Sequence, residues 1–365
     1  MTSSAHAAAS PRASSWANLE EAILPPVVGL LVAAIIGDIL ILSFGQNPGH
    51  VYRLLIEGTW GNAYGLGQVL YKTTTLTFTG LAVAMGLRAG LFNIGAESQL
   101  AAGGFVAAMV GLLLPVGLPP LITLPVYILA AAIGGGVVGG IPGALKAKFG
   151  AHEVITTIML NFIVLALLNY LVSAHVRVAD SLHTADIRTG ALPRLSQYVP
   201  AFHGSAANVV IFVALATAIA SGWFLFRTRR GFELRAVGMQ PDAAEYGGVR
   251  VGNVWWQTMT LSGAIAGIGG LNFVLGYKHY YEEAFASGAG FLGIAVAIVG
   301  RNHPIGVVVA ALVFATMSQG GLAVNAVVPR QMVDVLQAVV IIAVAASVPE
   351  VRRMLLRGRA AGERS

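Results

Sequence analysis

The sequence predicts an all-α membrane protein: a polytopic transmembrane helix bundle of about ten spans, with both termini in the cytoplasm. Of the 365 residues, 56% are hydrophobic and only 10% are charged. This composition is too apolar for one soluble core, so lipid must be the solvent for most of the chain. Apolar runs of bilayer length recur along the sequence, and the basic residues between them are divided unequally between the two sides.

Ten apolar stretches are candidates for crossing, since a bilayer core needs about 20 mostly apolar residues per helix. The first is too long for a signal-peptide core and lacks a convincing cleavage site, so we expect an uncleaved span. Two of the later stretches are short, and half-helices or one broken hairpin are alternatives to two full crossings there. The stretches are 22–44, 66–86, 91–115, 119–142, 154–175, 207–226, 256–275, 285–300, 304–319 and 331–349, of which 285–300 and 304–319 are the short ones.

The basic residues indicate the orientation. With the N-terminus in the cytoplasm, fifteen Lys and Arg fall on the inner side and six on the outer side, as the positive-inside rule requires. An even number of crossings then places the C-terminus inside as well. The expected organisation is a cytoplasmic tail at 1–21, a transmembrane domain at 22–349 with an external loop at 176–205 and a cytoplasmic loop at 227–255, and a basic cytoplasmic tail at 350–365.

The cytoplasmic loop is the longest connection on the inner side, and it carries five Arg. We expect one or two short amphipathic helices in it. The break at Gly238-Met239-Gln240-Pro241 separates 232–237 from 242–246, because Gly and Pro both interrupt helices.

Several kinds of chemistry are absent from the sequence. The chain has no cysteine, which excludes thiol nucleophiles and thiolate metal sites. His152-Glu153 begins like a zinc-protease motif, but Thr156 stands where the second histidine is required, and no Walker loop for ATP occurs. We therefore expect no catalytic residue, no metal site, no cofactor and no enzymatic activity in this chain.

Charged groups within the predicted spans are few, and they include Asp38, Lys72 and Glu97. Ion-coupled transporters usually carry buried carboxylates with partners, so their scarcity favours a motor-driven or passive path for a largely neutral solute. The basic residues form no contiguous stripe, so we expect membrane lipid and no nucleic acid as a partner.

Polar residues stand at the start of one predicted span, where residues 90–100 read GLFNIGAESQL. Asn93 and Glu97 are four residues apart and share a helix face, so they could hydrogen-bond a neighbouring helix or a polar solute. The alternative is an N-terminal cap with a first-turn acid stabilised by the helix dipole.

Four motifs resemble those of one family. Residues 90–100 are similar to the signature FNIGAEGQ, with Ser98 in place of Gly. Residues 150–161, GAHEVITTIMLN, are similar to GANEVITTIMLN, with His152 in place of Asn. Residues 235–248, RAVGMQPDAAEYGG, resemble RAVGxNPxAAxYAGI, and residues 293–304, GIAVAIVGRNHP, resemble GIAVALLGRNNP.

The motifs that these segments resemble are those of bacterial ABC importer permeases of the branched-chain amino acid and ribose type. More narrowly, they resemble the simple-sugar and nucleoside branch that works with Bmp-type lipoproteins, over residues 66–349. The resemblance implies a permease subunit that moves a nucleoside or simple sugar by alternating access, whereas a secondary transporter or passive channel for a small neutral polar solute is the alternative. It also implies three partners: an ABC ATPase, a solute-binding lipoprotein and a second permease subunit, for which a heterodimer is favoured over a homodimer.

The resemblance also implies two sets of functional residues. The first would dock on the ATPase: Arg235, Gly238, Pro241, Asp242, Ala244, Glu245, Tyr246 and Gly247. The second set consists of polar side chains in or near spans, which could line the solute path or equally could join helices: Asn93, Glu97, Gln99, Thr156, Thr157, Asn161 and Asn272.

Overall fold

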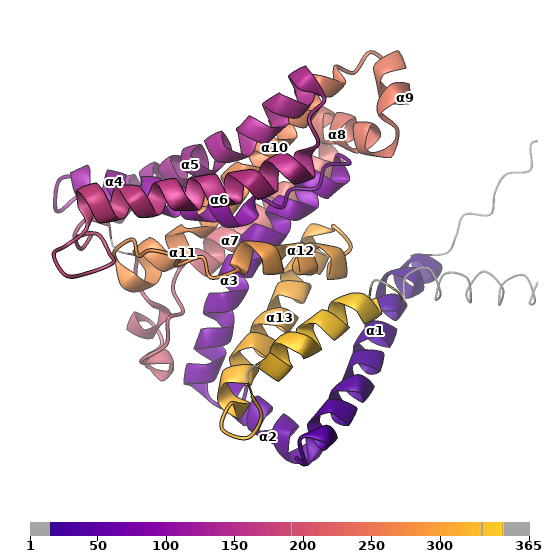
Figure 1. Cartoon of the computed structure of the whole chain (residues 1–365), viewed down its shortest axis with the longest axis vertical. Coiled ribbons are helices and arrows are strands. Elements are labelled where there is room, and N and C mark those ends of the chain that lie inside the picture. Colours follow the sequence, from indigo (N-terminus) through magenta and orange to yellow (C-terminus); the bar gives the residue numbers. More distant parts are fainter. Residues whose placement is uncertain (1–14, 191, 330, 345, 347–365) are drawn as a thin grey trace, which may run out of the picture. The chain divides into compact units, whose positions relative to one another are not determined.

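The computed structural model describes residues 15–190, 192–329, 331–344 and 346, which are largely helical (Figure 1). Two compact units contain them: residues 49–333 form one, and residues 15–48 with 334–344 belong to the other. The predicted all-α class is confirmed for this described part of the chain, where β-structure is limited to isolated bridges. The predicted C-terminal tail at 350–365 lies outside the described residues.

The helices follow one another with mostly short connections. They are α1 Ser15–Ser43, α2 Pro48–Thr59, α3 Ala63–Arg88, α4 Ala96–Leu113, α5 Pro120–Phe149, α6 Glu153–Leu171, α7 Val210–Arg227, α8 Arg229–Met239, α9 Pro241–Tyr246, α10 Val251–Gly269, α11 Leu271–Phe273, α12 Ala289–Val299, α13 Pro304–Val324 and a last helix at Gln331–Val344. Single π-helical turns extend α6 at Val172–Val176 and α11 at Val274–Lys278, and short 3₁₀ turns lie at Leu195–Gln197 and Pro200–Phe202.

Among the described residues, six helices are long and apolar enough to cross a bilayer, or seven if Val27–Ser43 and Pro48–Thr59 form one broken span. Helices occupy all ten predicted stretches, but the count of ten crossings is not confirmed. α3 is long enough to cross a bilayer, but its many threonines make it less apolar than the six candidates. The helices Ala289–Val299 and Gln331–Val344 are apolar but too short to cross alone as regular helices.

Within the unit formed by 49–333, α5 and α10 pack with their backbones in close approach (Figure 1). Gly135 and Gly139 of α5 face Gly263 and Gly267 of α10, and a Cβ atom on any of the four would overlap the opposite backbone. Small residues four apart permit this approach between membrane helices. These two GxxxG pairs therefore serve packing inside the chain.

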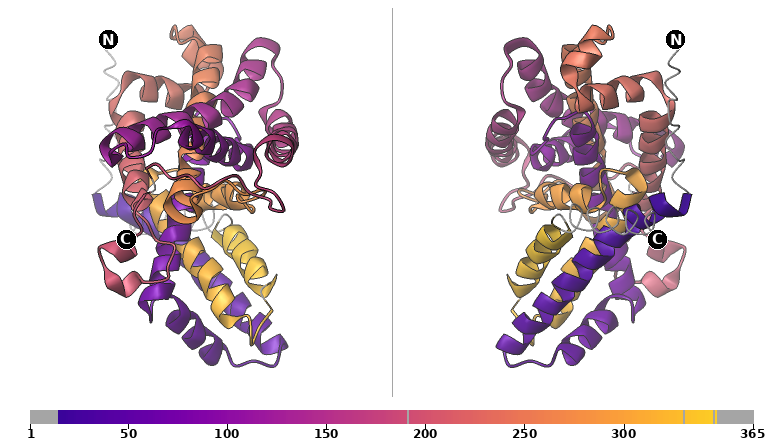
Figure 2. Two further views of the ribbon diagram at one scale, coloured as in Figure 1. Left: turned by 90° about the vertical axis from the view of Figure 1, so that its left-hand side faces the viewer. Right: turned by 90° about the vertical axis from the view of Figure 1, so that its right-hand side faces the viewer.

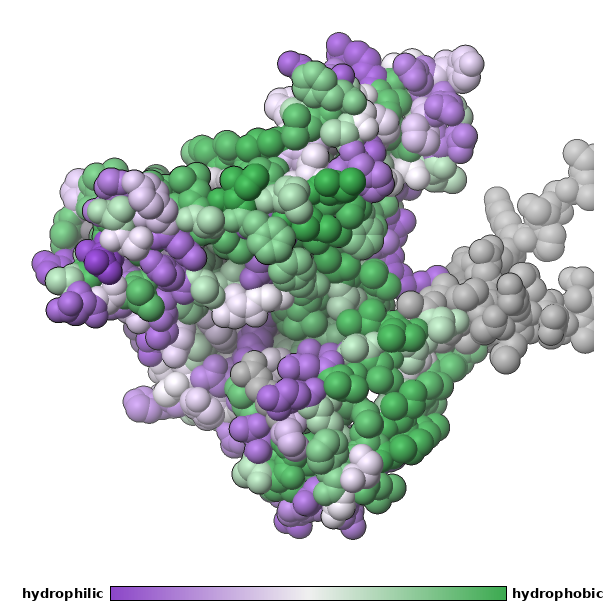
Figure 3. Space-filling model, in the orientation of Figure 1, coloured by the Kyte–Doolittle hydropathy of each residue, from purple (hydrophilic) through white to green (hydrophobic). Residues whose placement is uncertain are grey.

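The core beside this seam is formed by small and branched apolar residues of α4, α5 and α6. The buried side chains of Ala101, Ala102, Val138, Val164 and Leu168 form one cluster. The outward faces of the same unit are also apolar: Phe162 is 69% exposed and Ile219 is 75% exposed. Figure 3 shows a hydrophobic surface over α5, α6 and α10, which suits contact with lipid tails.

The segment between α6 and α7 folds over the end of α11. Its backbone N–H groups at Thr184, Ile187 and Leu192 donate to the carbonyls of Tyr281, His279 and Leu275, at 2.9, 2.7 and 3.0 Å. The buried Tyr127 hydroxyl of α5 donates to Thr189 in the same segment, at 2.6 Å. The segment predicted as an external loop at 176–205 is thus hydrogen-bonded over the end of α11 and against α5.

In the other unit, α1 packs against the last helix, where Gly29 lies in contact with the backbone of Val344. α1 begins at Ser15, earlier than the predicted span at 22, because the polar turn before the apolar run is also helical. Leu31 and Ile35 on its outer face are 61% and 60% exposed.

Candidate functional site

The connection between α3 and α4 is the polar centre of the unit formed by 49–333. α3 ends at Arg88, the chain turns at Gly90 with a φ of +72°, and α4 begins at Ala96. The φ value suits glycine, which has no Cβ to oppose it. The Asn93 side chain accepts the N–H of Gly95 at 2.9 Å, an Asx turn that directs the chain into α4.

Asn93 and Gln99, both predicted for the solute path, bond to each other. The Asn93 amide donates to Gln99 Oε1 at 2.8 Å, and the Gln99 amide donates back to Asn93 Oδ1 at 3.0 Å. Asn93 Nδ2 also donates to Ser262 Oγ of α10 at 2.7 Å, and this hydroxyl donates to Ala82 O of α3 at 2.6 Å. The network joins α3, α4 and α10.

Asn161 connects α6 to the same segment. Its Oδ1 accepts the N–H of Ser98 at 3.1 Å, and its Nδ2 donates to Ile94 O at 2.9 Å. Thr156 and Thr157, also predicted for the path, donate their hydroxyls to carbonyls of the preceding turn, including Glu153 O at 3.1 and 2.7 Å. Within the described part of the chain, these hydroxyls bond to their own helix and its cap, and not to another helix.

Glu97 lies at the start of α4 and is only 5% exposed. Its two carboxylate oxygens accept the N–H groups of Gly288 and Gly290 at 2.7 and 2.6 Å. These groups stand at the start of α12, where the partial positive charge of a helix N-terminus favours an anion. Glu97 thus joins the N-terminal ends of α4 and α12.

Asn272 of α11 belongs to a second, separate group. Its Nδ2 donates to Tyr71 O and Thr75 Oγ1 of α3, at 2.9 and 2.8 Å. Its Oδ1 accepts from Asn208 Nδ2, just before α7, at 2.9 Å. Among the described residues, this group shares no hydrogen-bonding residue with the network around Asn93.

The sequence did not indicate Ser262, Asn208, Gly288 or Gly290 as parts of these networks. Two of them could have been suspected from their positions in the sequence. Ser262 stands immediately before the GxxxG pair of α10, and Asn208 is a polar residue at the start of an apolar run. The two glycines contribute backbone N–H groups alone, which leave no side-chain signature.

The predicted pair of short cytoplasmic-loop helices is present as α8 and α9, with Gln240 between them. Both lie at one end of the bundle in the two side views of Figure 2. Gly238 of α8 packs directly against the carbonyl of Arg88, at the end of α3. The helix pair therefore touches the connection that contains Asn93.

A cationic cluster surrounds this contact. The guanidinium groups of Arg88 and Arg235 lie 5.7 and 5.3 Å from the centre of the Phe226 ring, and His303 stacks on that ring at 5.4 Å. Arg88 Nε also donates to Asn302 O at 2.9 Å. Burial, together with the charge of Arg88, lowers the pKa of His303 from its ordinary value, which favours the neutral imidazole.

α9 combines a buried anchor with exposed side chains. Pro241 begins the helix, Ala244 is buried, and Asp242 and Glu245 are exposed. Tyr246 is 95% exposed, an unusual placement for a large aromatic ring. Gly247 ends the helix. The surface over α8 and α9 is mixed and largely polar (Figure 3).

All four motif segments meet around residues 88–99. Asn161 contacts this stretch from the second motif, Gly238 from the third, and Asn302 from the fourth. Segments far apart in sequence thus form one structural unit, which connects the α8–α9 pair to the ends of α3, α4 and α12.

The chain is similar in sequence to permease proteins of ABC transporters. The guanosine ABC transporter permease protein NupP of Bacillus subtilis is 36% identical over 334 residues, which cover 89% of this chain and 93% of that protein. The nucleoside ABC transporter permease protein NupB of Lactococcus lactis is 32% identical, with 90% and 92% covered. The glucose ABC transporter permease protein TsgB13 of Haloferax volcanii is 34% identical, with 87% and 85% covered.

No solved structure matches the chain. Residues 65–345 match the family described as the permease component of the branched-chain amino acid transport system. This match extends over all four motif segments and the helices that carry them. The chain therefore belongs to this family of permease components.

Proposed function

We propose that this permease subunit carries a nucleoside or simple sugar across the membrane by alternating access, driven through the α8–α9 pair. The observation that carries the proposal is the packing of Gly238 against the Arg88 carbonyl, beside the Asn93 network. As an ABC permease the chain is a non-catalytic protein of the inner membrane. ATP hydrolysis belongs to a partner ATPase, and a substrate-binding protein delivers the solute.

The α8–α9 pair is proposed to dock on the ATPase. Tyr246 supports this role because an exposed aromatic ring suits the centre of a protein interface, while exposed Asp242 and Glu245 would lie around it. Gly238 and Arg235 would transmit the movement to α3. The complete proposed docking set is Arg235, Gly238, Pro241, Asp242, Ala244, Glu245, Tyr246 and Gly247.

The solute path is proposed to run beside the helices that the polar networks hold together. ATP-driven displacement of α8 would shift the ends of α3, α4 and α12 as packed elements. In this proposal Asn93, Gln99, Asn161 and Glu97 fix those elements in one state and become available to solute hydroxyls in another. Thr156, Thr157 and Asn272 complete the proposed border of the path.

Ten crossings with both termini in the cytoplasm remain our proposal for the topology. It places α8 and α9 at 227–255 inside and the segment at 176–205 outside, as the distribution of basic residues supports. A second permease subunit, different in sequence, is proposed to complete the pathway, and no nucleic acid takes part. The absence of cysteine allows single-cysteine labelling from either side to test each loop.

The solute class rests on the relatives, whose printed names specify guanosine, nucleosides and glucose. The partner substrate-binding protein should be screened by thermal shift against purine and pyrimidine nucleosides and against pentoses and hexoses. Stabilisation by one of these classes, followed by its uptake through the assembled transporter, is the expected result. Stabilisation by branched-chain amino acids alone would contradict the proposal.

Docking can be tested with Tyr246→Ala in the assembled transporter. Loss of an aromatic ring at an interface centre typically costs at least about 1–2 kcal/mol, so ATPase association should weaken about tenfold while the bundle stays folded. Tyr198→Ala is the matched control, because Tyr198 is also exposed, at 68%, but lies in the segment before α7. Equal ATPase binding by both variants would contradict the docking role.

A further inference from the structure

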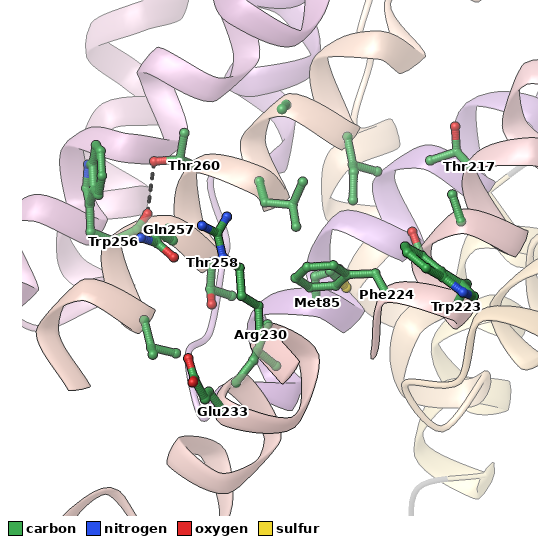
Figure 4. A pocket seen from close by; sticks show the side chains of 17 residues that line it. Met85, Thr217, Trp223, Phe224, Arg230, Glu233, Trp256, Gln257, Thr258 and Thr260 are labelled. Atoms are coloured by element: carbon green, nitrogen blue, oxygen red, sulfur yellow. Dashed lines mark hydrogen bonds between the residues drawn. The ribbon is translucent and has the colours of Figure 1, made fainter. Parts of the chain in front are cut away.

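A pocket of about 660 Å³ opens on the flank of the unit formed by 49–333, between α7, α8 and α10. It is separate from the polar networks described above. Its lining follows α10 from Val254 to Ile265, which is about 16 Å of helix. Figure 4 shows its walls, with Phe224 and Trp223 on one side and Trp256 on the other.

Most of the pocket lining is apolar. Met85, Ala220, Leu261, Ala264 and Ile265 line it with aliphatic groups. The hydroxyls of two threonines at the wall are hydrogen-bonded within their own helices. Thr260 donates to Trp256 O at 2.9 Å, and Thr217 donates to Val213 O at 2.8 Å. A nucleoside or sugar would find few hydrogen-bond partners in this part of the pocket. A hydrocarbon chain has no hydrogen-bonding groups, so it needs none.

One edge of the pocket is cationic. Glu233 pairs with Arg229, whose Nε lies 2.9 Å from Oε1, so its charge is already compensated. Arg230 lines the same edge and points into the pocket in Figure 4. Within the described part of the chain, no carboxylate pairs with it. The edge therefore presents an uncompensated guanidinium group directly beside an apolar cavity.

Trp223 and Trp256 flank this edge and are 65% and 47% exposed. Exposed tryptophan in a membrane helix is typical of the interface where acyl chains meet headgroups. A guanidinium at that level suits a phosphate, with which it forms charge-assisted and often bidentate hydrogen bonds. We propose that this pocket binds one anionic phospholipid, with its phosphate on Arg230 and an acyl chain between α7 and α10.

The test uses single-cysteine chemistry, because the natural chain has no cysteine. Ala220→Cys, labelled with a fluorescent maleimide, is assembled with its partner subunits in nanodiscs containing brominated phosphatidylglycerol or brominated phosphatidylcholine. Bromine quenches a fluorophore that touches the lipid chain. Quenching at this site should favour phosphatidylglycerol about fivefold, the enrichment expected for one arginine near the surface. Ile219→Cys, exposed outside the pocket, should show no such preference.

The role of Arg230 is isolated by Arg230→Gln on the Ala220→Cys background. This change should remove the preference for phosphatidylglycerol, whereas Arg250→Gln, which removes an exposed arginine outside the pocket, should retain it. Equal quenching by both lipids in the parent protein would overturn the proposal. Absence of quenching by either lipid would also overturn it, in favour of a protein partner on this face.

Discussion

At the scale of single residues, Glu97 shows how an acidic side chain can be accommodated inside a membrane helix. Its carboxylate accepts two backbone N–H groups at the start of α12, which lie 191 and 193 residues further along the chain. Gly290 permits the approach, because a Cβ there would overlap the backbone of Glu97. The carboxyl group therefore has two hydrogen-bond donors and stands at a helix terminus that favours an acidic group.

Glu97→Gln should destabilise the protein by about 1–3 kcal/mol, the cost of leaving a buried donor unsatisfied. The glutamine amide can offer only one acceptor oxygen, so one of the two glycine N–H groups would face an NH₂ group. Thermal unfolding of the detergent-purified protein measures the effect. A lowered midpoint with retained helical content is the expected outcome.

Glu57→Gln is the matched control for this change. Glu57 pairs with Arg53 at 2.8 Å, but both side chains are more than half exposed. Exposed ion pairs contribute about 0–1 kcal/mol, so the unfolding midpoint should change little. If Glu97→Gln were as mild as this control, the carboxylate would not hold α12 in place.

At the scale of elements, the α5–α10 seam depends on which glycine faces the partner helix. A Cβ atom on Gly135 would overlap the backbone of Gly263, whereas a Cβ on Gly136 would meet nothing closer than 3.4 Å. The two glycines are neighbours in α5, so replacing either one by alanine changes the intrinsic helix propensity by the same amount. They therefore separate the effect of packing from that of helix formation.

Gly135→Ala should destabilise the bundle by about 1–3 kcal/mol through overpacking. Gly136→Ala should be neutral or slightly stabilising, since alanine favours a helix over glycine by about 0.5–1 kcal/mol. Thermal unfolding of both variants, with the wild type alongside, checks the prediction. Equal midpoints for the two variants would contradict the close approach of α5 and α10.

Much of this element structure could be predicted from hydropathy alone, because apolar runs of bilayer length are a strong signal. One or two short helices were also predictable at 227–255, although α8 continues through Gly238 to Met239 and only Gln240 lies between α8 and α9. α2 was not predicted, since Pro48–Thr59 carries Arg53 and Glu57 and is amphipathic instead of uniformly apolar. The expected start of a span at 91 was early, because residues 89–95 form the turn around Asn93 and α4 begins at Ala96.

The sequence identified the polar residues proposed for the solute path, but it did not predict their hydrogen-bond partners. Asn93 and Gln99 stand in one motif, yet their mutual pairing depends on the Asx turn that reverses the chain between them. The partners of Glu97 are backbone groups nearly 200 residues away, which no local pattern encodes. Ser262 is recruited by helix packing, so its role follows from the tertiary structure.

At the scale of the whole molecule, the unit formed by 49–333 provides a short route from α9 to the polar networks. α9 follows α8 after one residue, and Gly238 near the end of α8 rests on Arg88. Seven residues separate Arg88 from Ala96, where α4 begins. A displacement of the helix pair would thus reach the start of α4 through backbone contacts. Few flexible side chains lie between them to absorb the movement.

Gly238→Ala tests this route in the complete transporter. A Cβ at Gly238 would overlap the Arg88 carbonyl, so α8 must separate from the end of α3 while Tyr246 remains free to bind. We expect ATPase association to persist but solute uptake to fall about fivefold or more, which corresponds to loss of about 1 kcal/mol of coupling. Gly252→Ala is the control, since its nearest neighbour, Ala147, lies 3.5 Å from the added atom. Full uptake by Gly238→Ala would show that movement enters the bundle elsewhere, whereas loss of ATPase binding would assign Gly238 to docking instead of transmission.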